Sequence, residues 1–395
     1  MIRKGPIQQS RMTHEEAVAR SCALTPAIQA QAATAETQRR LSEETVQAII
    51  DAGLIRLLVP ARLGGYELSI ETALDAVIEI AMADASAGWC YSFFVSHPIL
   101  LLYFSEQAQD EVWGNDPDAL ISTSLTPIGR FTPAEGGYRL NGNWAWSSGV
   151  DWSDWILLSA LPASMDGPPR FFLLPRSDCE VIDTWFVAGL AASGSQNVEV
   201  KDIFVPAHRT ALLSDLIHGL RSGSTLDTRK LNTLPLFTFF GAFIAAPLLG
   251  ATIGAYEIWR ERSRQRQSTM SHELVTTSTH QQIRLAETAV DISASRALLN
   301  EALAIIRSGA PIPPAQYNQI RLSYSAIARF CVGAMERIFI NGGAGANYSS
   351  NPLQRFWRDI HTMSAHIGFS FDLHGEAFAR SEFGLPPSPH DPFAL

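Results

Sequence analysis

Apolar residues follow two different rhythms along the chain. Over Thr13–Trp113 they recur at the three- and four-residue spacing of a helix, and within Ser69–Ala83 they share one helical face. Over about Ala119–Arg209 the pattern changes to short alternating runs bounded by Gly and Pro, which is typical of strands and turns. Over about Ala211–Phe383 the helical spacing returns.

These regions predict an α+β fold. We expect an N-terminal helical domain over 1–117, a central β domain over 118–212, a C-terminal four-helix bundle over 213–383 and an extended Pro-rich tail over 384–395. The strand-like runs follow one another without intervening helices. This favours a mostly antiparallel sheet or barrel over a βαβ arrangement.

The C-terminal region contains the most apolar stretch of the chain. No charged residue occurs between Lys230 and Glu257, and these 26 residues are long enough to cross a bilayer. Because Pro235 and Pro247 interrupt the stretch and no second clean span exists, we expect a central core helix and no membrane contact. The helices predicted here are Leu236–Arg266, His280–Ser308, Ala315–Ile340 and Asn351–Arg380.

Charge and cysteine usage exclude several classes of function. The formal net charge is -9, and the densest basic run, Arg260–Arg266, is short and interrupted by Glu261, so we expect no nucleic-acid partner. Four cysteines without CxxC spacing and a polar N-terminus indicate a reducing, cytoplasmic location. His361 and His366 would lie about 140° apart around a helix, so we expect no metal.

Five short segments, in this order and spacing, resemble the acyl-CoA dehydrogenase superfamily over nearly the whole chain. They are Leu58–Tyr66, Gly137–Gly142, Val205–Arg209, Asn341–Gly345 and Arg355–Asp359. The resemblance implies that superfamily's helix–sheet–helix fold.

The chain departs from the dehydrogenases of that superfamily at their catalytic base. Removal of a proton alpha to a thioester needs a positioned carboxylate. Ile360–Gly375 contains no Glu, Glu376 follows in a different local order, and the 236–256 stretch has no acidic residue before Glu257. A dehydrogenase base is therefore missing from the expected positions.

Three other features resemble the oxygenase components of two-component aromatic hydroxylases such as the 4-hydroxyphenylacetate hydroxylases. They are the segment Asn141–Gly149, His97 in the preceding helical domain, and His366 after the Arg358-Asp359 pair. His97 lies 51 residues before Ser148. The resemblance implies that a separate NAD(P)H:flavin reductase supplies FADH2. It also implies that this reduced flavin reacts with molecular oxygen to form a flavin C4a-hydroperoxide. His361 and His374 compete with His366 for the third feature.

The same resemblance implies how the flavin is held. Ser148 would hydrogen-bond the flavin N5 and Trp146 would pack on the ring, although a turn hydroxyl and a core aromatic residue are the alternatives. Arg262 would reach a neighbouring subunit's pyrophosphate, with Arg264 and Arg266 as competitors. The other cofactor contacts implied are Ser124, Leu125 and Thr126 at the ring and ribityl chain, Gly194 and Ser195 at the tail, and Gly342, Gly343 and Gly345 at the adenine end across a subunit interface. FAD would then fit better than FMN, and the protein would be a homotetramer.

The substrate implied by the resemblance is a small aromatic compound of the phenol or indole type. His97 would hydrogen-bond or deprotonate its OH or NH, since an imidazole titrates near neutral pH; a satisfied core histidine is the alternative. Pro98 would end or kink the helix of His97. His366 would orient the substrate or act as the base. Phe93, Phe94, Phe240, Phe243 and Thr123 are further candidate pocket residues, with core packing as the alternative for each Phe.

Two other functions remain open at this point. An acyl-CoA dehydrogenase or nitroalkane-oxidase-like flavin oxidase would need a carboxylate base at the flavin, for which Asp372 is the nearby candidate. A non-enzymatic scaffold with the same fold would need no catalytic side chains.

Overall fold

The N-terminal helices assemble around one fully buried helix. The computed structural model describes residues 12–219, 234–269, 271–308 and 312–394. Ser and Asp side chains cap the helices here; for example, Asp84 accepts a hydrogen bond from the Ala87 N–H at 2.8 Å. The helices are α1 (His14–Gln38), α2 (Glu43–Asp51), α3 (Ile70–Ala83), α4 (Ala85–Leu101) and α5 (Glu106–Trp113).

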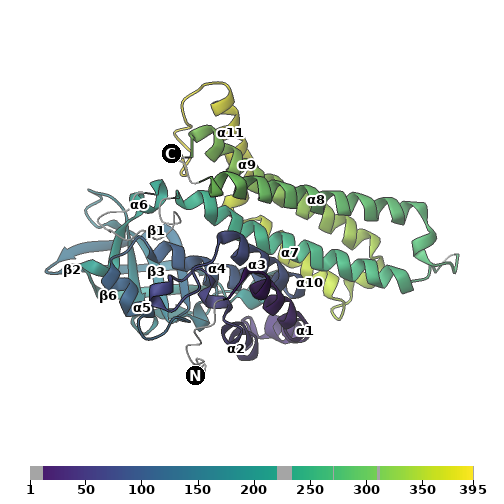
Figure 1. Cartoon of the computed structure of the whole chain (residues 1–395), viewed down its shortest axis with the longest axis horizontal. Helices are drawn as coiled ribbons and strands as arrows, with labels where there is room; N and C mark the ends of the chain where they lie inside the picture. Colours follow the sequence, from purple (N-terminus) through teal and green to yellow (C-terminus); the bar gives the residue numbers. More distant parts are fainter. Residues whose placement is uncertain (1–11, 220–233, 270, 309–311, 395) are drawn as a thin grey trace.

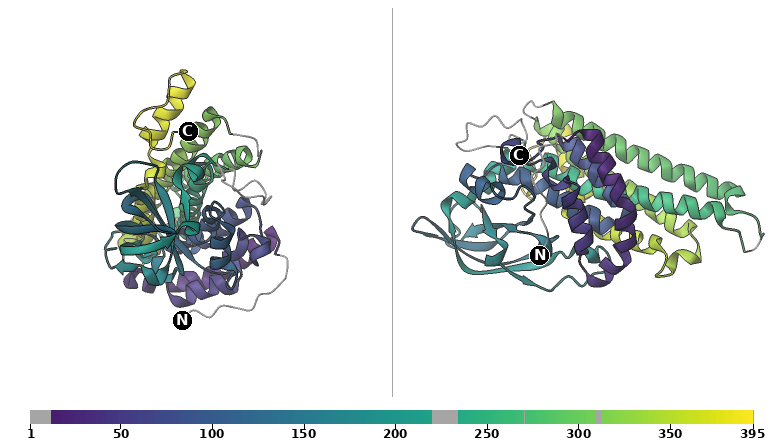
Figure 2. Two further views of the ribbon diagram at one scale, coloured as in Figure 1. Left: turned by 90° about the vertical axis from the view of Figure 1, so that its left-hand side faces the viewer. Right: turned by 60° about the horizontal axis from the view of Figure 1, so that its bottom comes forward.

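All residues of α4 are buried, which explains why its sequence is apolar on every side. The helix continues past Pro98 to Leu101, so the expectation that this proline ends the helix is wrong. Helices α3 and α7 pack on α4, and the start of the first strand lies beside it. The helix therefore sits at the junction of all three regions, as Figures 1 and 2 show.

The central region is an open, mixed sheet of seven strands in the order β5-β6-β2-β1-β3-β4-β7. Five of its six strand pairs are antiparallel, which agrees with the prediction, and β1 with β3 is parallel. The end strands β5 and β7 are not neighbours, so it is a sheet and not a barrel. The strands are β1 (Ile121–Ala134), β2 (Gly137–Ser147), β3 (Trp155–Pro162), β4 (Arg170–Pro175), β5 (Glu180–Ile182), β6 (Gln196–Pro206) and β7 (Thr210–Leu212).

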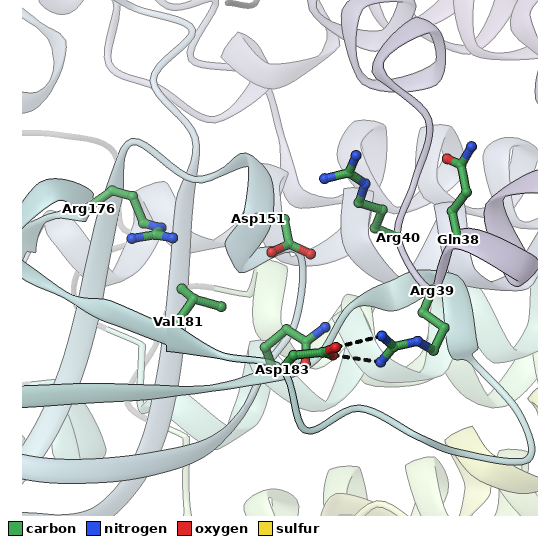
Figure 3. Close-up of a pocket in the computed structure, with 8 residues that line it drawn as sticks. Gln38, Arg39, Arg40, Asp151, Arg176, Val181 and Asp183 are labelled. Atoms are coloured by element: carbon green, nitrogen blue, oxygen red, sulfur yellow. Dashed lines mark hydrogen bonds and ion pairs between the residues drawn. The ribbon is translucent and has the colours of Figure 1, made fainter.

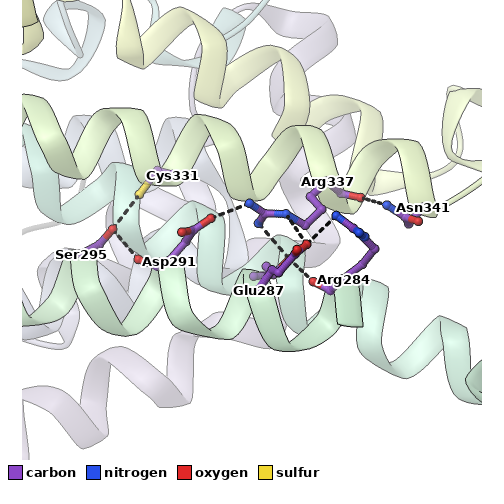
Figure 4. A network of polar contacts seen from close by, with 8 residues as sticks. Arg284, Glu287, Asp291, Ser295, Cys331, Arg337 and Asn341 are labelled. Atoms are coloured by element: carbon purple, nitrogen blue, oxygen red, sulfur yellow. Dashed lines mark hydrogen bonds and ion pairs between the residues drawn. The ribbon is translucent and has the colours of Figure 1, made fainter. Parts of the chain in front are cut away.

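The C-terminal region is built on long helices that extend away from the sheet (Figure 1). Charged side chains join α8 to α9: the Arg337 guanidinium donates to Asp291 at 2.8 Å and lies 3.3 Å from Glu287 (Figure 4). The helices are α6 (Leu213–His218), α7 (Leu236–Gln265), α8 (Thr279–Arg307), α9 (Pro314–Asn341), α10 (Pro352–Ser364) and α11 (Phe371–Glu382).

Helix α7 is, among the described residues, the one helix long and apolar enough to span a membrane. In the structure 89% of its most apolar window is buried, against α3, α4, α8, α9 and α10. This is the packing expected of a central core helix.

The predicted helix over Asn351–Arg380 is wrong, because the chain forms two helices there. Helix α10 ends at Ser364 and α11 begins at Phe371, with the short helix η10 (Ile367–Phe369) between them. The His366 ring accepts the Gly368 N–H at 3.0 Å and so caps η10. The chain end, expected to be an extended tail, lies back against α9 and α7 through Asp391 and Phe393.

A buried ion pair fastens the N-terminal region to the segment before the first strand. Arg56 contacts the Asp118 carboxylate through Nε at 2.6 Å and also through Nη2, and both side chains are almost fully buried. Removing one partner leaves an uncompensated buried charge, which typically costs about 3–5 kcal/mol.

We therefore expect Asp118→Asn to lower the stability of the protein by about 3–5 kcal/mol. Thermal unfolding followed by circular dichroism measures the change. Asp202→Asn is the matched control, because Asp202 pairs with Arg139 at 3.1 Å on the surface, where such pairs contribute about 0–1 kcal/mol. Equal losses in the two variants would contradict the importance of the buried pair.

Candidate active site

A row of aromatic rings along α4 forms the centre of the candidate site. Trp89, Phe93 and His97 follow one another at four-residue spacing, so they share one face of the helix. The Phe93 ring stacks on His97 with centroids 5.4 Å apart and meets Trp89 edge-on at 5.1 Å. From other elements, Phe240 of α7 lies 5.9 Å from Phe93, and His366 lies 5.9 Å from Trp89.

The structure thus brings together four of the predicted substrate residues, Phe93, His97, Phe240 and His366. It adds Trp89, which the sequence argument missed, although the period of four in Trp89–Phe93–His97 was a usable signal. We call these five rings the aromatic row.

His97 carries a buried acceptor that nothing in the described structure satisfies. Its side chain is 1% exposed, and Nδ1 lies 2.6 Å from the Ile121 carbonyl oxygen. Because a carbonyl only accepts, Nδ1 carries the proton and Nε2 is left with a lone pair. Burial lowers the pKa of His97 to about 4, so the ring is neutral at physiological pH. Within the described residues Nε2 has no hydrogen-bond partner.

A satisfied core histidine is therefore not what the structure contains. Leaving a buried polar atom unpaired costs about 1–3 kcal/mol. Nε2 of His97 is one of eight such side-chain atoms among the described residues, and it is the one that belongs to the aromatic row. An O–H or N–H donor on a ligand in the aromatic row would satisfy Nε2.

His366 has the opposite tautomer to His97. Its Nδ1 accepts the Gly368 N–H at 3.0 Å, so in the neutral ring the proton sits on Nε2, which is a donor. Burial lowers the pKa of His366 to about 4 as well. Of its two competitors, His361 bonds the Glu336 carboxylate at 2.8 Å and His374 bonds the Ser325 hydroxyl at 2.8 Å. Neither of these two has a ring contact with the aromatic row among the described residues.

Ser148 is joined directly to the aromatic row. The Trp89 indole N–H donates to Ser148 Oγ at 3.1 Å, and Ser148 Oγ lies 2.8 Å from Ser195 Oγ. Ser195 Oγ in turn lies 2.7 Å from Ser193 Oγ. The side chain of Ser195 therefore lies beside Ser148, in addition to any backbone contact expected of it, and Phe94 packs against Gly149, the next residue after Ser148.

Two irregularities in the sheet open its surface beside Ser148. The register of β1 on β3 shifts between Ser124 and Gly129, and that of β2 on β6 shifts between Trp144 and Ser147. The predicted contacts Leu125 and Thr126 lie in the first interval, outside the regular ladder. The Ser124 hydroxyl donates to the Ala145 carbonyl at 3.1 Å and so joins the two intervals.

Trp146 lies in the second interval and is 70% exposed, with a φ of 66°. The alternative that it is a core aromatic residue is therefore wrong. An exposed indole beside a register shift in the strand ladder suits a flat aromatic cofactor, which needs an apolar face and nearby backbone donors and acceptors.

Two of the predicted pocket residues make core or sheet contacts in the structure. Phe243 is fully buried in the main core, and its carbonyl accepts the Ser92 hydroxyl. The Thr123 hydroxyl donates to the Leu157 carbonyl at 2.9 Å within the sheet.

The predicted subunit-crossing residues lie at the end of α7 remote from Phe240. Arg262 is 22 residues beyond Phe240 on α7, about 33 Å at 1.5 Å per residue. Arg264 pairs with Glu261, and Arg266 donates to the Gly342 and Asn341 carbonyls beside Gly343 and Gly345. Among the described residues Arg262 has no ion pair, which leaves it the freest of the three competitors. One protomer cannot place these residues at its own aromatic row.

A separate, polar cavity of about 530 Å³ lies between the end of α1 and the sheet (Figure 3). The Arg39–Asp183 pair, bonded at 2.6 and 2.7 Å, forms one rim. Gly194 lies beside both Asp151 and the Arg39 carbonyl. None of the five rings of the aromatic row lines this cavity, whose lining residues are Gln38, Arg39, Arg40, Asp151, Arg176, Val181, Asp183 and Gln196.

The Arg355–Asp359 segment supports the site from behind. Arg355 Nε lies 3.7 Å from the Asp84 carboxylate, which caps α4. Asp359 accepts the Leu190 N–H at 2.6 Å, in the turn that leads to Ser193 and Ser195. Burial, together with the nearby Asp84 charge, raises the pKa of Asp359 to about 7.

This raised pKa predicts a pH-dependent stability. In the unfolded chain Asp359 ionises near its ordinary pKa of about 4. The folded state opposes ionisation, so stability falls as pH rises from about 4 to 7, by a few kcal/mol in total. Asp359→Asn keeps the acceptor for Leu190 and should remove that part of the slope. Thermal melts from pH 4 to 8 test this, with the exposed Asp372→Asn as control; a variant slope equal to that of the wild type would contradict it.

Comparison with known proteins adds two kinds of match. The family model "Acyl-CoA dehydrogenase, N-terminal domain" matches residues 14–115, and "Acyl-CoA dehydrogenase, C-terminal domain" matches residues 242–371. The chain is 34% identical to the flavin-dependent monooxygenase oxygenase subunit HsaA of Rhodococcus jostii, over 92% of this chain and 97% of that protein.

It is 30% identical to the oxygenase component of p-hydroxyphenylacetate 3-hydroxylase of Acinetobacter baumannii, over 92% of this chain and 88% of that protein. The solved structure of XiaF from Streptomyces, in complex with FADH2 and glycerol, superposes with a TM-score of 0.89 at 27% identity. That match covers 95% of this chain and 96% of XiaF.

Proposed function

Because the chain belongs to the acyl-CoA dehydrogenase family, and within it to the oxygenase components of flavin-dependent monooxygenases, we propose that it hydroxylates a small aromatic compound of the phenol or indole type. It would use reduced flavin and molecular oxygen. The observation that carries the proposal is the buried, unpaired Nε2 of His97 in the aromatic row. Phenolic O–H and indole N–H groups are the donors that this acceptor requires, attached to rings that suit the row.

The residues around Ser148 fit a flavin. Trp146 offers an exposed ring face, Ser148 offers a buried hydroxyl, and the backbone of Ser124–Thr126 lies where the strand ladder is broken. These residues would hold the isoalloxazine. When bound, the reduced flavin supplies the activation of oxygen, for which the family resemblance indicates a C4a-hydroperoxide.

The chain's own residues would prepare the substrate and exclude water. His97 Nε2 would accept the proton of the aromatic OH or NH and so raise the electron density of the ring. His366 would donate a hydrogen bond through Nε2. The burial of α4 would keep water away from the His97 imidazole, because Trp89, Phe93 and His97 are each less than 10% exposed.

The flavin oxidase alternative lacks a suitable base. Asp372, its candidate carboxylate, is exposed on α11. A scaffold without activity offers no reason for an unpaired buried imidazole.

Rapid mixing tests the proposal. Protein with reduced FAD is mixed anaerobically with oxygenated buffer while the near-ultraviolet flavin spectrum is followed. We expect an oxygenated-flavin spectrum that persists for seconds and decays faster when a phenol or an indole is added. Immediate formation of oxidised flavin, as in free solution, would sink the proposal, and acyl-CoA and nitroalkane oxidation would be tested next.

Replacing His97 separates its role in catalysis from its role in packing. His97→Phe keeps an aromatic ring but removes the acceptor, so hydroxylation should fall about 10²–10⁴-fold, the usual contribution of a general base. Flavin oxidation should continue and release hydrogen peroxide. His361→Phe is the matched control and should retain near-normal hydroxylation, since His361 bonds Glu336 on another helix. Equal losses of hydroxylation in both variants would contradict the assignment of His97.

The proposal extends to the assembly and the cofactor, as a homotetramer that binds FAD. Arg262 lies at the end of α7 remote from Phe240, which supports a contact with the flavin of a neighbouring copy. Helix α8 carries an exposed, uncharged stripe at heptad spacing that suits contact with a second copy. Its residues are Ile283, Ala286, Val290, Ser293 and Ala297.

Arg262→Ala tests the cofactor and the assembly together. If Arg262 contacts a neighbour's pyrophosphate, its loss should raise the Kd for FAD about tenfold or more, as expected for a charge-assisted contact. The Kd for FMN, which has no pyrophosphate, should change less than about twofold on the same reasoning. Arg264→Ala is the control, because Arg264 pairs with Glu261. Equal effects on FAD and FMN would exclude the contact.

A separate NAD(P)H:flavin reductase would supply the reduced cofactor, as the oxygenase-component names of the relatives suggest. A reducing, cytoplasmic location is supported by the four cysteines, all of which are free.

A further inference from the structure

The end of the chain is anchored by a buried ion pair on α9. Both oxygens of Asp391 contact the Arg321 guanidinium at 2.8 Å, and the two side chains are only 3% and 2% exposed. Two-point pairing of this kind fixes orientation as well as distance. The Tyr317 hydroxyl donates to the Phe393 carbonyl at 2.8 Å and so fixes the chain two residues further on.

This anchor presses one aromatic side chain onto the start of α7. The Phe393 ring meets the Phe237 ring with centroids 4.5 Å apart and an interplanar angle of 61°. The Arg321 guanidinium lies over the same Phe393 ring at 5.5 Å. Phe393 is therefore clamped between α9 and the first turn of α7.

The first turns of α7 transmit this contact to the aromatic row. Phe237, Phe240 and Ile244 lie three, four and seven residues apart, so they share one face of the helix. Phe240 contacts Phe93 of the aromatic row, and Ile244 lies against Gly368, directly beside His366. One face of α7 therefore contacts the tail through Phe237. Further along the helix, the same face contacts the proposed substrate site through Phe240 and Ile244.

Helix α9 holds this face from behind. The Tyr324 ring packs directly on Gly241, where a Cβ would come within 2.2 Å of it, and its hydroxyl donates to the Thr238 carbonyl at 2.6 Å. The first turns of α7 therefore have supports from Tyr324 and Phe393, and just before them the Tyr103 hydroxyl donates to the Leu234 carbonyl at 2.8 Å. Loss of the tail contact removes the support that bears on the Phe237 ring.

We propose that the segment Ser388–Phe393 is a strap that sets the width of the aromatic site, with Phe393 as a positioning residue that determines which ring sizes are accepted. The inference rests on the proposed function, because it assumes that Phe240 and His366 border the substrate. Without Phe393, the Phe237 ring loses its contact with the tail, and the first turns of α7 shift away from α4 more readily. Two-ring substrates would then gain and one-ring substrates would lose packing contacts.

Equilibrium binding of two aromatic ligands tests the strap without turnover. Phenol and 2-naphthol are titrated into the full-length protein by calorimetry, and the ratio of their Kd values is compared between variants. Phe393→Ala should shift the ratio in favour of 2-naphthol by about tenfold, the scale on which pocket size discriminates ligands. Phe383→Ala, which removes a Phe that is 79% exposed in the same region, should leave the ratio unchanged.

A second variant covers loss of folding. If Phe393→Ala unfolds, Phe393→Leu keeps most of the apolar volume and should shift the ratio in the same direction by a smaller factor. A wild-type ratio in a folded Phe393 variant would overturn the strap. His97→Phe should weaken phenol binding in every background; if it does not, the proposed aromatic site itself fails, and that outcome is distinct from failure of the strap.

Discussion

The complete burial of α4 is the constraint on which the rest of the site depends. Every residue of this helix is buried, so each polar group on it needs a partner inside the protein. Asp84 caps the helix, the Ser92 hydroxyl donates to α7, and Trp89 donates to Ser148. These bonds fix the helix against the sheet on one side and the bundle on the other. Against that background, the free Nε2 of His97 is the exception that marks the site.

The buried charges behind α4 serve the same purpose. Arg355 lies near the Asp84 carboxylate. Asp359 accepts the Leu190 N–H, in the turn that leads to Ser193 and Ser195 beside Ser148. One short segment of α10 therefore supports both α4 and the turn that leads to Ser193 and Ser195. Carboxylates placed this deeply are costly when ionised, so their contribution is positioning more than net stability.

Much of the fold could be predicted from the sequence, because it depends on local patterns. The helical spacing of apolar residues located α3, α7, α8 and α9 to within a few residues. The His97–Ser148 spacing indicated the family. What could not be predicted depends on contacts between distant segments. The parallel pairing of β1 with β3 has no local signature, and the break before α11 depends on the cap by His366 and not on a proline. The roles of Trp89 and Phe393 required their partners, Ser148 and Phe237, to be seen beside them.

Trp146 has a consequence for the timing of the reaction. A non-glycine residue at positive φ is strained by roughly 1–2 kcal/mol. Here its neighbours hold it in place, since Ser124 bonds Ala145 and Ser147 bonds Ser122. The strain is therefore met during folding, and, if Trp146 packs on the flavin as we propose, its ring is already in position when the flavin arrives. Reduced flavin in free solution is oxidised by oxygen, so its binding to the protein competes with that oxidation. A binding surface that needs no rearrangement raises the association rate, because binding that waits for a conformational change is slower.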